Sequence, residues 1–291
     1  MKLTGNTILL TGGSGGIGRA LARRFHDLGN DVIITGRRRA ALDETIAGRE
    51  RMRADLLDIE DPEAIRDFIR HIAATGSKIN ILINNAGIMP LEDISQPRDL
   101  SDAKAVIETN LLGPIRLIDK LLPQLLSQLD PVIVNVTSGL AFQPTTRAPT
   151  YSATKAALHS YTVSLRIALK GKIEVIELVP PGVQTDLTPG QASNPNYQPL
   201  DEFADEAIRL FTQVPTPPEI LVERVKPLRF AERDGTALAL AASVPWKKRA
   251  VGFVGESDGW RQLKKHGQLV HQFTRADDGN VALCGELDLS A

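Results

Sequence analysis

The sequence predicts an α/β fold in which a parallel, doubly wound sheet of six or seven strands is flanked by helices. Six short apolar segments alternate with stretches of helical periodicity, a glycine-rich turn directly follows the first of them, and polar motifs follow most of the others. Ligands of such sheets bind at the carboxyl ends of the strands, so these motifs should converge on one crevice. The expected strands span residues 7–11, 31–35, 51–54, 79–83, 131–137 and 173–179.

Composition and length fit one catalytic domain with an extension. The 291 residues are 42% hydrophobic and 24% charged, and a net charge of −1 gives no attraction to nucleic acid or to an anionic membrane. A single cysteine suits a reducing compartment, and no signal peptide or membrane span is recognisable, so we expect a cytoplasmic protein. We place the domain at residues 1–235, with a substrate lid at 186–235. The extension at 236–291, where periodicity fades, is expected to be partly disordered.

The turn after the first strand fits a phosphate cradle, because a helical pattern from Arg19 to Leu28 follows it at once. Glycines let the backbone approach a ligand closely, and a helix N-terminus offers free N–H groups to an anion. A glycine-rich loop alone is a common false match, but its place between a strand and a helix indicates dinucleotide binding and a Rossmann-type sheet. The expected cofactor contacts are Gly12, Ser14, Gly15, Gly16, Ile17 and Gly18.

The second strand is followed by basic residues where an NAD-binding sheet would carry an acidic one. A carboxylate at this point binds the ribose 2′-hydroxyl of NAD, whereas this chain has Gly36-Arg-Arg-Arg39. A guanidinium can hold a 2′-phosphate in a bidentate pair. We therefore expect NADP(H), bound by Arg37 and then Arg38, with NAD(H) as the alternative. The competing interpretation is a solvated basic run at the start of a helix.

The third and fourth strands lead into two further candidate contacts. Asp55 and Leu56 end the third strand, where an adenine could rest, and Asp61-Pro62 begins a helix to about Ala74. The fourth strand runs into Asn84-Asn-Ala-Gly87. Its amides and glycine suit backbone contact between Asn85, Ala86 or Gly87 and a cofactor, or equally a hydrogen-bonded corner that stabilises the sheet.

A long helical pattern from Ser101 to Gln128 carries Asn110, Pro114 and Pro123. The prolines predict bends or an interruption of the helix. Asn110 lies on an apolar face and needs partners if it is buried. It is either a structural residue at a kink or the holder of a water beside the active site.

The next helical pattern, residues 150–169, places two groups of catalytic interest four residues apart. Tyr151 and Lys155 share a helix face, so the phenol and the ammonium can point into one site. An isolated tyrosine titrates near about 10, and a neighbouring cation favours its phenolate and lowers that pKa. The competing interpretation is a surface tyrosine with a lysine one turn later. Apolar residues nearly encircle this helix, so a second face is expected to meet a partner subunit.

Beyond the sixth strand, residues 188–200 are rich in Pro, Asn, Gly and Gln, which is typical of an irregular lid. We expect two helices after it, at residues 201–212 and 219–233, and an edge strand at 251–254. Apolar side chains near the site predict a largely apolar substrate pocket. Its expected lining residues are Met89, Leu91, Leu140, Ala141, Phe142 and Tyr197.

Five motifs, in this order and spacing, resemble the short-chain dehydrogenase/reductase family from about Lys2 to about Thr188. They are Thr11-Gly-Gly-Ser-Gly-Gly-Ile-Gly18, Asn84-Asn-Ala-Gly87, Ser138, Tyr151-Ser-Ala-Thr-Lys155 and Pro181-Gly182. The surroundings of Ser138, Lys155 and Gly182 are also similar to those of the DltE-type oxidoreductases. The family's usual closing strand with an Asp-Gly-Gly ending is not recognisable.

The resemblance implies a role for each motif residue. Tyr151 would be the general acid in carbonyl reduction, Lys155 would bind the nicotinamide ribose and lower the pKa of Tyr151, and Ser138 would bind the substrate oxygen. Asn110 would order a water connected to Lys155. Pro181, Gly182 and Val183 would contact the cofactor, Val183 through its backbone at the carboxamide, and Thr185 would lie near the phosphates.

The implied protein is an NADP(H)-dependent oxidoreductase that interconverts a small-molecule carbonyl and an alcohol, as a homodimer or homotetramer without bound metal. The alternative is a Rossmann-type protein that senses NADP(H) without turnover. Such a sensor would have no use for Tyr151 or Lys155, so the presence of both favours the enzyme.

Overall fold

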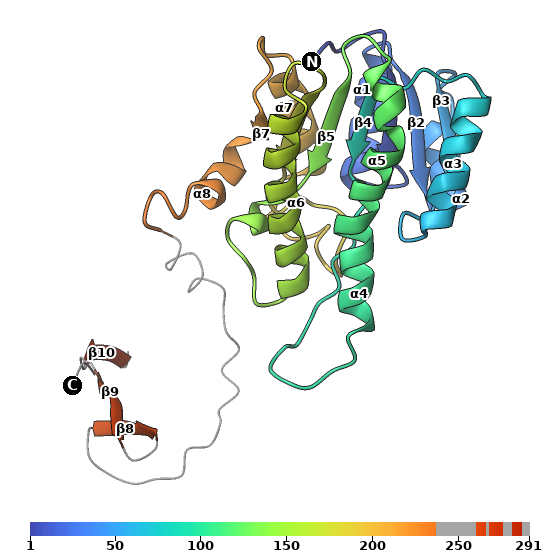
Figure 1. Ribbon diagram of the computed structural model, residues 1–291. Helices are drawn as coiled ribbons and strands as arrows, with labels where there is room; N and C mark the ends of the chain where they lie inside the picture. Colours follow the sequence, from blue (N-terminus) through green and yellow to red (C-terminus); the bar gives the residue numbers. More distant parts are fainter. Residues whose placement is uncertain (237–259, 266–267, 276–280, 287–291) are drawn as a thin grey trace. The chain divides into compact units, whose positions relative to one another are not determined.

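The computed structural model describes residues 1–236, 260–265, 268–275 and 281–286, in two compact units, Met1–Pro245 and Trp246–Ala291 (Figure 1). The first unit contains, in chain order, β1 (Thr7–Thr11), α1 (Gly16–Asp27), β2 (Asp31–Gly36), α2 (Arg39–Ile46), β3 (Met52–Leu56), α3 (Pro62–Ala74), β4 (Ile81–Asn84), α4 (Ser101–Ile107), the π-helical turn η1 (Glu108–Leu112), α5 (Gly113–Leu126), β5 (Val132–Val136), η2 (Gly139–Ala141), α6 (Pro149–Ala168), β6 (Glu174–Val179), α7 (Leu200–Phe211), β7 (Glu219–Leu221), η3 (Glu223–Val225) and α8 (Lys226–Arg229).

The first unit is built on a seven-stranded sheet in the order β3-β2-β1-β4-β5-β6-β7, in which every neighbouring pair is parallel. The strand order reverses between β1 and β4, because the chain builds outward through β2 and β3 and then crosses to the other side of β1. The fold class predicted from the sequence is therefore confirmed. The reversal also fixes where a ligand crevice is expected, at the carboxyl ends of β1 and β4.

Helices cover both faces of this sheet (Figure 1). Successive residues of a strand point to opposite faces, so in β1 Ile8 and Leu10 pack against one apolar layer and Leu9 against the other. The first layer includes Phe25 of α1 and Phe203 of α7, and the second includes residues of α3, α5 and α6. Burial of both faces explains why the strands read as continuous apolar runs in the sequence.

One prediction about helices is corrected, and the predicted interruption of the helical pattern at 101–128 is confirmed. Residues 219–233 do not form one helix: Glu219–Leu221 is the closing strand β7, which pairs with β6 through the Leu178–Ile220 register. A three-residue strand is too short to show its own periodicity, and only its pairing reveals it. The long helix at 101–128 is interrupted at Glu108–Leu112, around Asn110, whereas Pro123 lies inside α5.

The second unit contains a three-stranded antiparallel sheet in the order β10-β9-β8, formed by β8 (Trp260–Lys265), β9 (Gln268–Arg275) and β10 (Val281–Glu286). The edge strand expected at residues 251–254 lies outside the described residues. In the part of the chain that the structure describes, no helix has the length and apolar character needed to cross a bilayer.

Candidate active site

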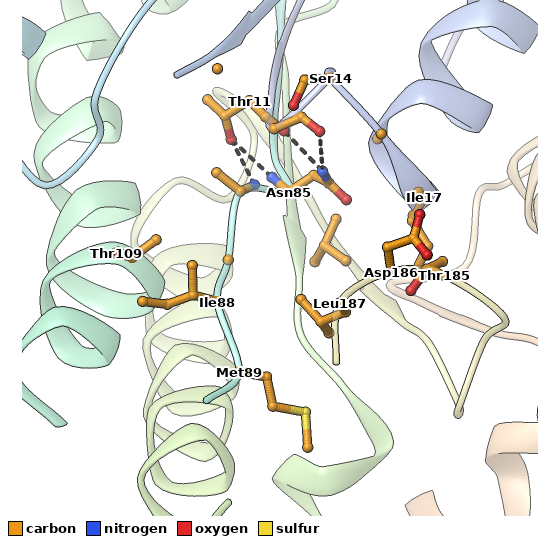
Figure 2. Close-up of a pocket in the computed structure, with 18 of the residues that line it drawn as sticks. Thr11, Ser14, Ile17, Asn85, Ile88, Met89, Thr109, Thr185, Asp186 and Leu187 are labelled. Atoms are coloured by element: carbon orange, nitrogen blue, oxygen red, sulfur yellow. Dashed lines mark hydrogen bonds between the residues drawn. The ribbon is translucent and has the colours of Figure 1, made fainter. Parts of the chain in front are cut away.

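A cavity of about 990 Å³ lies where the strand order reverses and contains most of the motifs identified in the sequence. Figure 2 shows part of its wall, with Thr11 at the end of β1 and Ser14 after it, Asn85 and Ile88 after β4, and Thr185 and Leu187 after β6. The predicted contacts that line it are Gly12, Ser14, Gly15, Gly16, Ile17, Gly18, Arg37, Arg38, Asn85, Ala86, Gly87, Met89, Ser138, Tyr151, Lys155, Pro181, Val183 and Thr185. Motifs far apart in the sequence therefore meet in one crevice.

The glycine-rich turn packs so tightly that side chains would not fit at Gly12, Gly13 or Gly18. A Cβ on Gly12, whose φ is +72°, would lie 2.8 Å from the Ala86 Cα, and one on Gly18 would lie 2.2 Å from the Gly12 oxygen. The Thr11 hydroxyl accepts hydrogen bonds from the Asn85 and Ala86 N–H groups, both at 3.0 Å. This close backbone surface at the start of α1 fits a dinucleotide pyrophosphate. The Asn84–Gly87 turn thus serves as a hydrogen-bonded corner, and Asn85, Ala86 and Gly87 also face the cavity.

The two residues expected near an adenine lie away from the cavity. Asp55 and Leu56 do not line the cavity, since they belong to β3 itself, where Asp55 lies 3.7 Å from Arg53 and Leu56 is largely exposed. The four residues after the strand line the cavity in their place: Leu57, Asp58, Ile59 and Glu60. The sequence prediction ended β3 at Ala54, two residues before its end, and that difference moved the expected contacts away from the edge of the sheet.

Arg37 and Arg38 both reach the cavity, but Arg37 has an acidic neighbour that the local sequence does not reveal. Its Nη1 lies 3.4 Å from Glu60 Oε1, and the same carboxylate oxygen accepts a hydrogen bond from the Thr109 hydroxyl at 2.5 Å. The Arg37 side chain remains 55% exposed and is free to turn toward a ligand phosphate. A carboxylate supplied by the β3–α3 connection therefore lies beside Arg37, the residue expected to bind a 2′-phosphate.

Tyr151 and Lys155 lie side by side in the first turns of α6, and both are buried. The Lys155 Nζ is 5.6 Å from the centroid of the Tyr151 ring and donates a hydrogen bond of 2.9 Å to the Val136 carbonyl. Burial raises the pKa of Tyr151 to about 12, and a hydrogen bond with Ser138 opposes part of that rise. Burial also lowers the pKa of Lys155 to about 8. Without a ligand, desolvation thus outweighs the expected lowering of the tyrosine pKa, and it favours the neutral form of both groups.

Asn110 joins η1 to the chain after β4. Its Oδ1 accepts a hydrogen bond from the Ile88 N–H, and its Nδ2 donates to the Ile88 carbonyl, both at 2.9 Å. These bonds give it the structural role that was one of the two alternatives. A Cβ on Gly87 would lie 3.2 Å from Asn110 Oδ1 and 3.6 Å from Lys155 Nζ, so both side chains adjoin the same glycine.

The expected substrate residues separate into two groups. Met89 and Leu91 line the cavity, whereas Leu140, Ala141, Phe142 and Tyr197 do not. The Phe142 ring contacts His159 at 4.7 Å between centroids and lies 4.4 Å from the Arg229 guanidinium, and Tyr197 covers Gly182, which is also outside the lining. Sequence reasoning missed Leu187 and Pro189, which supply apolar lining from the irregular segment after β6.

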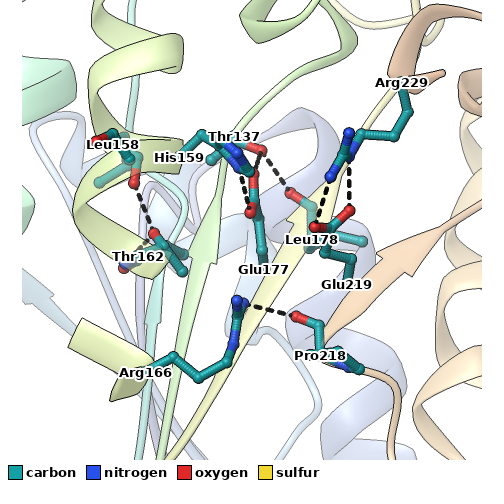
Figure 3. A network of polar contacts seen from close by, with 12 residues as sticks. Thr137, Leu158, His159, Thr162, Arg166, Glu177, Leu178, Pro218, Glu219 and Arg229 are labelled. Carbon is teal, nitrogen blue, oxygen red and sulfur yellow. Dashed lines mark hydrogen bonds and ion pairs between the residues drawn. The ribbon is translucent and has the colours of Figure 1, made fainter. Parts of the chain in front are cut away.

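A second polar cluster, centred on the buried Glu177, lies beside Thr137, the residue before Ser138 (Figure 3). Glu177 of β6 accepts hydrogen bonds from the Thr137 hydroxyl at 2.7 Å and from His159 of α6 at 2.8 Å. Arg229 binds Glu219 through two bonds of 2.7 and 2.9 Å, which hold the pKa of Glu219 below its usual range. Glu177, which interrupts an apolar run in β6, was the one sequence signal for this cluster.

Comparison with known proteins is consistent with this geometry. The sequence model of the short chain dehydrogenases matches residues 6–196. The uncharacterized oxidoreductase DltE of Bacillus subtilis (strain 168) is 38% identical over 80% of this chain and 94% of its own. The chain therefore belongs to the short-chain dehydrogenase/reductase family, whose members are oxidoreductases acting on CH–OH groups with NAD(P).

Solved structures extend the comparison to the fold. A short-chain dehydrogenase from Streptomyces avermitilis superimposes with a TM-score of 0.71 at 25% identity, covering 83% of this chain and 97% of that one. A serine dehydrogenase in complex with NADP⁺ gives a TM-score of 0.65 at 25% identity, over 71% of this chain and 89% of its own. A second sequence model, that of the N domain of glucodextranase, matches residues 221–291, which include η3 and α8 of the first unit.

Proposed function

We propose that this protein is an NADP(H)-dependent oxidoreductase that interconverts a carbonyl and an alcohol, with Tyr151 as the general acid and base. The observation that carries the proposal is the joint burial of Ser138, Tyr151 and Lys155 in the wall of the cavity that also contains the glycine-rich turn. A protein that only senses the cofactor would gain nothing from burying a phenol and an ammonium beside each other. Burial disfavours the charged forms of both groups, so the pair costs folding free energy unless it has a use.

The residues divide the chemistry among them. NADP(H), when bound, would supply or accept the hydride. Tyr151 would donate the proton to the carbonyl oxygen in reduction, and Ser138, which already hydrogen-bonds Tyr151, would donate a hydrogen bond to the same oxygen. Lys155 Nζ has one acceptor among the described residues, the Val136 carbonyl, so it has donors left for ribose hydroxyls. Asn110, fixed to Ile88, would order a water near Lys155.

The remaining cofactor assignments rest on the cavity lining. Gly12, Ser14, Gly15, Gly16, Ile17 and Gly18 would hold the pyrophosphate, with Thr185 near the phosphates and Val183 at the carboxamide. Arg37 and Arg38 support NADP(H) over NAD(H), although Glu60 competes with the phosphate for Arg37. If Arg37 binds the 2′-phosphate, Arg37→Asp moves the cofactor preference toward NADH, and an unchanged ratio of NADPH to NADH activity would refute this assignment.

We propose a neutral, apolar carbonyl compound as the substrate. Met89, Leu91, Leu187 and Pro189 give the cavity apolar walls, while its cationic lining among the described residues consists of Arg37, Arg38 and Lys155, which are assigned to the cofactor. A substrate carboxylate would therefore have no cation to pair with. Matched ketones that differ only in a terminal carboxylate test this preference, and the neutral member should have the higher kcat/KM.

The experiment that tests the proposal follows nicotinamide absorbance while the protein is mixed with NADPH and a panel of aliphatic aldehydes and ketones. We expect NADPH oxidation that depends on the carbonyl compound and is lost with Tyr151→Phe. Tight NADPH binding without oxidation across the panel would favour the sensor.

We also propose a cytoplasmic homodimer or homotetramer. The exposed Ile167 of α6 and Leu126 of α5 support assembly through these helices, since large apolar side chains favour burial. Sedimentation of the protein at micromolar concentration gives the assembly state, and a monomer at all concentrations would contradict this proposal.

A further inference from the structure

Glu92 lies on the connection between β4 and α4, and its carboxylate is buried, with no exposed side-chain surface. It is neither a motif residue nor part of the cavity lining. A buried carboxylate is costly unless donors surround it. Glu92 has several such donors, and two of them come from a single residue of the helix that carries Tyr151.

Those two donors belong to Thr150. Its N–H donates to Glu92 Oε1 at 2.9 Å, and its hydroxyl donates to Oε2 at 2.6 Å. The Glu92 N–H in turn donates to the Arg147 carbonyl at 2.9 Å. Ala148, the residue that precedes α6, has no side chain able to cap the helix, so Glu92 caps it from another part of the chain. A carboxylate here also interacts favourably with the N-terminal end of the helix dipole.

The cap lies immediately before the reacting residue. Tyr151 follows Thr150 in the first turn of α6, and its ring packs in a small apolar cluster with Val106, Ile88 and Met89. Met89 and Leu91, on the same connection as Glu92, line the cavity. Glu92 therefore joins the segment that lines the substrate end of the cavity to the helical turn that aims the phenol.

Arg98 fixes the orientation of the carboxylate. Its Nη2 donates to Glu92 Oε2 at 2.6 Å, and its Nη1 donates to Asp102 Oδ1 of α4 at 2.5 Å. Asp102 itself lines the cavity. The Glu92 carboxylate is thus held between α4 and α6, and rotation away from Thr150 would break its bond with Arg98.

We propose that Glu92 is a positioning residue that holds the first turn of α6, and with it the Tyr151 hydroxyl, in place against the substrate-lining segment. This inference rests on the proposed function of Tyr151. Its alternative is a purely structural cap, which would stabilise the fold without affecting proton transfer specifically.

Glu92→Ala, Glu92→Gln and Thr150→Val test the proposal, with Asp61→Ala as the matched control. Asp61 also caps a helix through a carboxylate, accepting from the Glu63 N–H at 2.8 Å, but it serves α3. We expect Glu92→Ala to lower the single-turnover rate of NADPH oxidation per folded molecule by about 10–100-fold, because small displacements of a reacting group are costly. Glu92→Gln should lower this rate by a smaller factor, since an amide oxygen can still accept a hydrogen bond from Thr150. NADPH affinity should stay within about twofold, because the cap touches no cofactor contact.

The control separates positioning from stability. Asp61→Ala should lower the melting temperature to a similar degree and change the rate less than about twofold. Equal rate losses in the control and in Glu92→Ala, a parallel loss of NADPH affinity, or an unchanged rate in Glu92→Ala would each overturn the proposal. If Glu92→Ala does not fold, Glu92→Gln and Thr150→Val decide the question by the same criteria.

Failure of the proposed function would be seen separately, as absence of turnover by the wild-type protein. In that case amide hydrogen exchange still tests the positioning role. Loss of protection confined to residues 150–152 in Glu92→Gln supports it, and unchanged or globally reduced protection overturns it.

Discussion

The Tyr151–Lys155 pair, which we propose to be catalytic, and the Glu177 cluster are two polar groups that share α6 but differ in how completely the protein satisfies their hydrogen bonds. Tyr151, Lys155 and His159 are spaced four apart on that helix, so they lie along one face. Both carboxylate oxygens of Glu177 have a donor, one from Thr137 and one from His159. The Lys155 ammonium, in contrast, has one acceptor among the described residues.

The difference separates a structural charge from a functional one. A buried charge whose hydrogen bonds are completed within the protein joins elements of the fold, here β6, α6 and the residue that follows β5. A buried ammonium with unpaired donors is stabilised only when a ligand supplies the acceptors. Burial therefore lowers the pKa of Lys155. Removal of the Glu177 carboxylate should therefore lower the stability of the fold, whereas removal of the Lys155 ammonium should raise it.

The largest expected effect is the loss of turnover in Tyr151→Phe. Removal of the hydroxyl deletes the proton donor, and general acid catalysis by a side chain typically contributes about 10²–10⁴-fold in rate. NADPH affinity, measured by quenching of protein fluorescence, should remain within about twofold. A near-native rate in this variant would show that Tyr151, like Glu177, has a structural role and not a catalytic one.

Glu177→Leu should destabilise the fold by about 2–4 kcal/mol, because the buried Thr137 hydroxyl and the half-buried His159 both lose their charged acceptor. Urea unfolding followed by circular dichroism measures the change. Glu177→Gln is the matched variant, because its side chain has a similar shape and retains an acceptor oxygen. Its loss in free energy of unfolding should be less than half that of Glu177→Leu. Equal stability of the wild type and the leucine variant would show that this cluster does not stabilise the protein.

Lys155→Met should instead stabilise the cofactor-free protein, by about 1–3 kcal/mol at pH 7. The pKa of Lys155 is about 8 in the folded protein against the ordinary 10.5, so the penalty for burying the ammonium is present in full below pH 8. It shrinks between pH 8 and 10.5 and vanishes above, so the advantage of the variant should fall across that window. Unfolding curves at several pH values check this. A variant less stable than the wild type at pH 7 would show that Lys155 is satisfied within the protein.

The smallest expected effect concerns Glu60, which pairs with the exposed Arg37. Glu60→Gln should raise the preference for NADPH over NADH by about 2–5-fold, since pairs exposed to this degree interact weakly. The ratio of kcat/KM for the two cofactors measures it, with Asp119→Asn on α5 as a remote control that also removes one carboxylate. A preference that moves toward NADH would show that Glu60 holds Arg37 in its binding conformation.

Most of the fold could be predicted from local sequence patterns. The six apolar strands and the Asp61-Pro62 helix start follow from periodicity and capping, and the Tyr151–Lys155 spacing needs only helical geometry. The structure brings the glycine-rich turn and this pair to one cavity, as expected from strands that end at one edge.

What the sequence could not show depends on contacts between distant residues. Glu219–Leu221 becomes a strand by pairing with β6, and Glu60 reaches Arg37 from the next strand connection. Phe142, four residues after Ser138 and directly after η2, was expected in the pocket as an apolar side chain near the site. Its ring turns instead to His159 and Arg229, which only the tertiary structure brings near.

Ionisation of Tyr151 with and without cofactor tests the central claim most directly. Phenolate absorbance of the wild type minus that of Tyr151→Phe isolates this residue from the other two tyrosines of the chain. The account predicts a pKa of about 12 for Tyr151 in the free protein and a clearly lower value with NADP⁺ bound, because a bound positive charge and an ammonium retained on Lys155 both favour the phenolate. The same Tyr151 pKa in both states would contradict it.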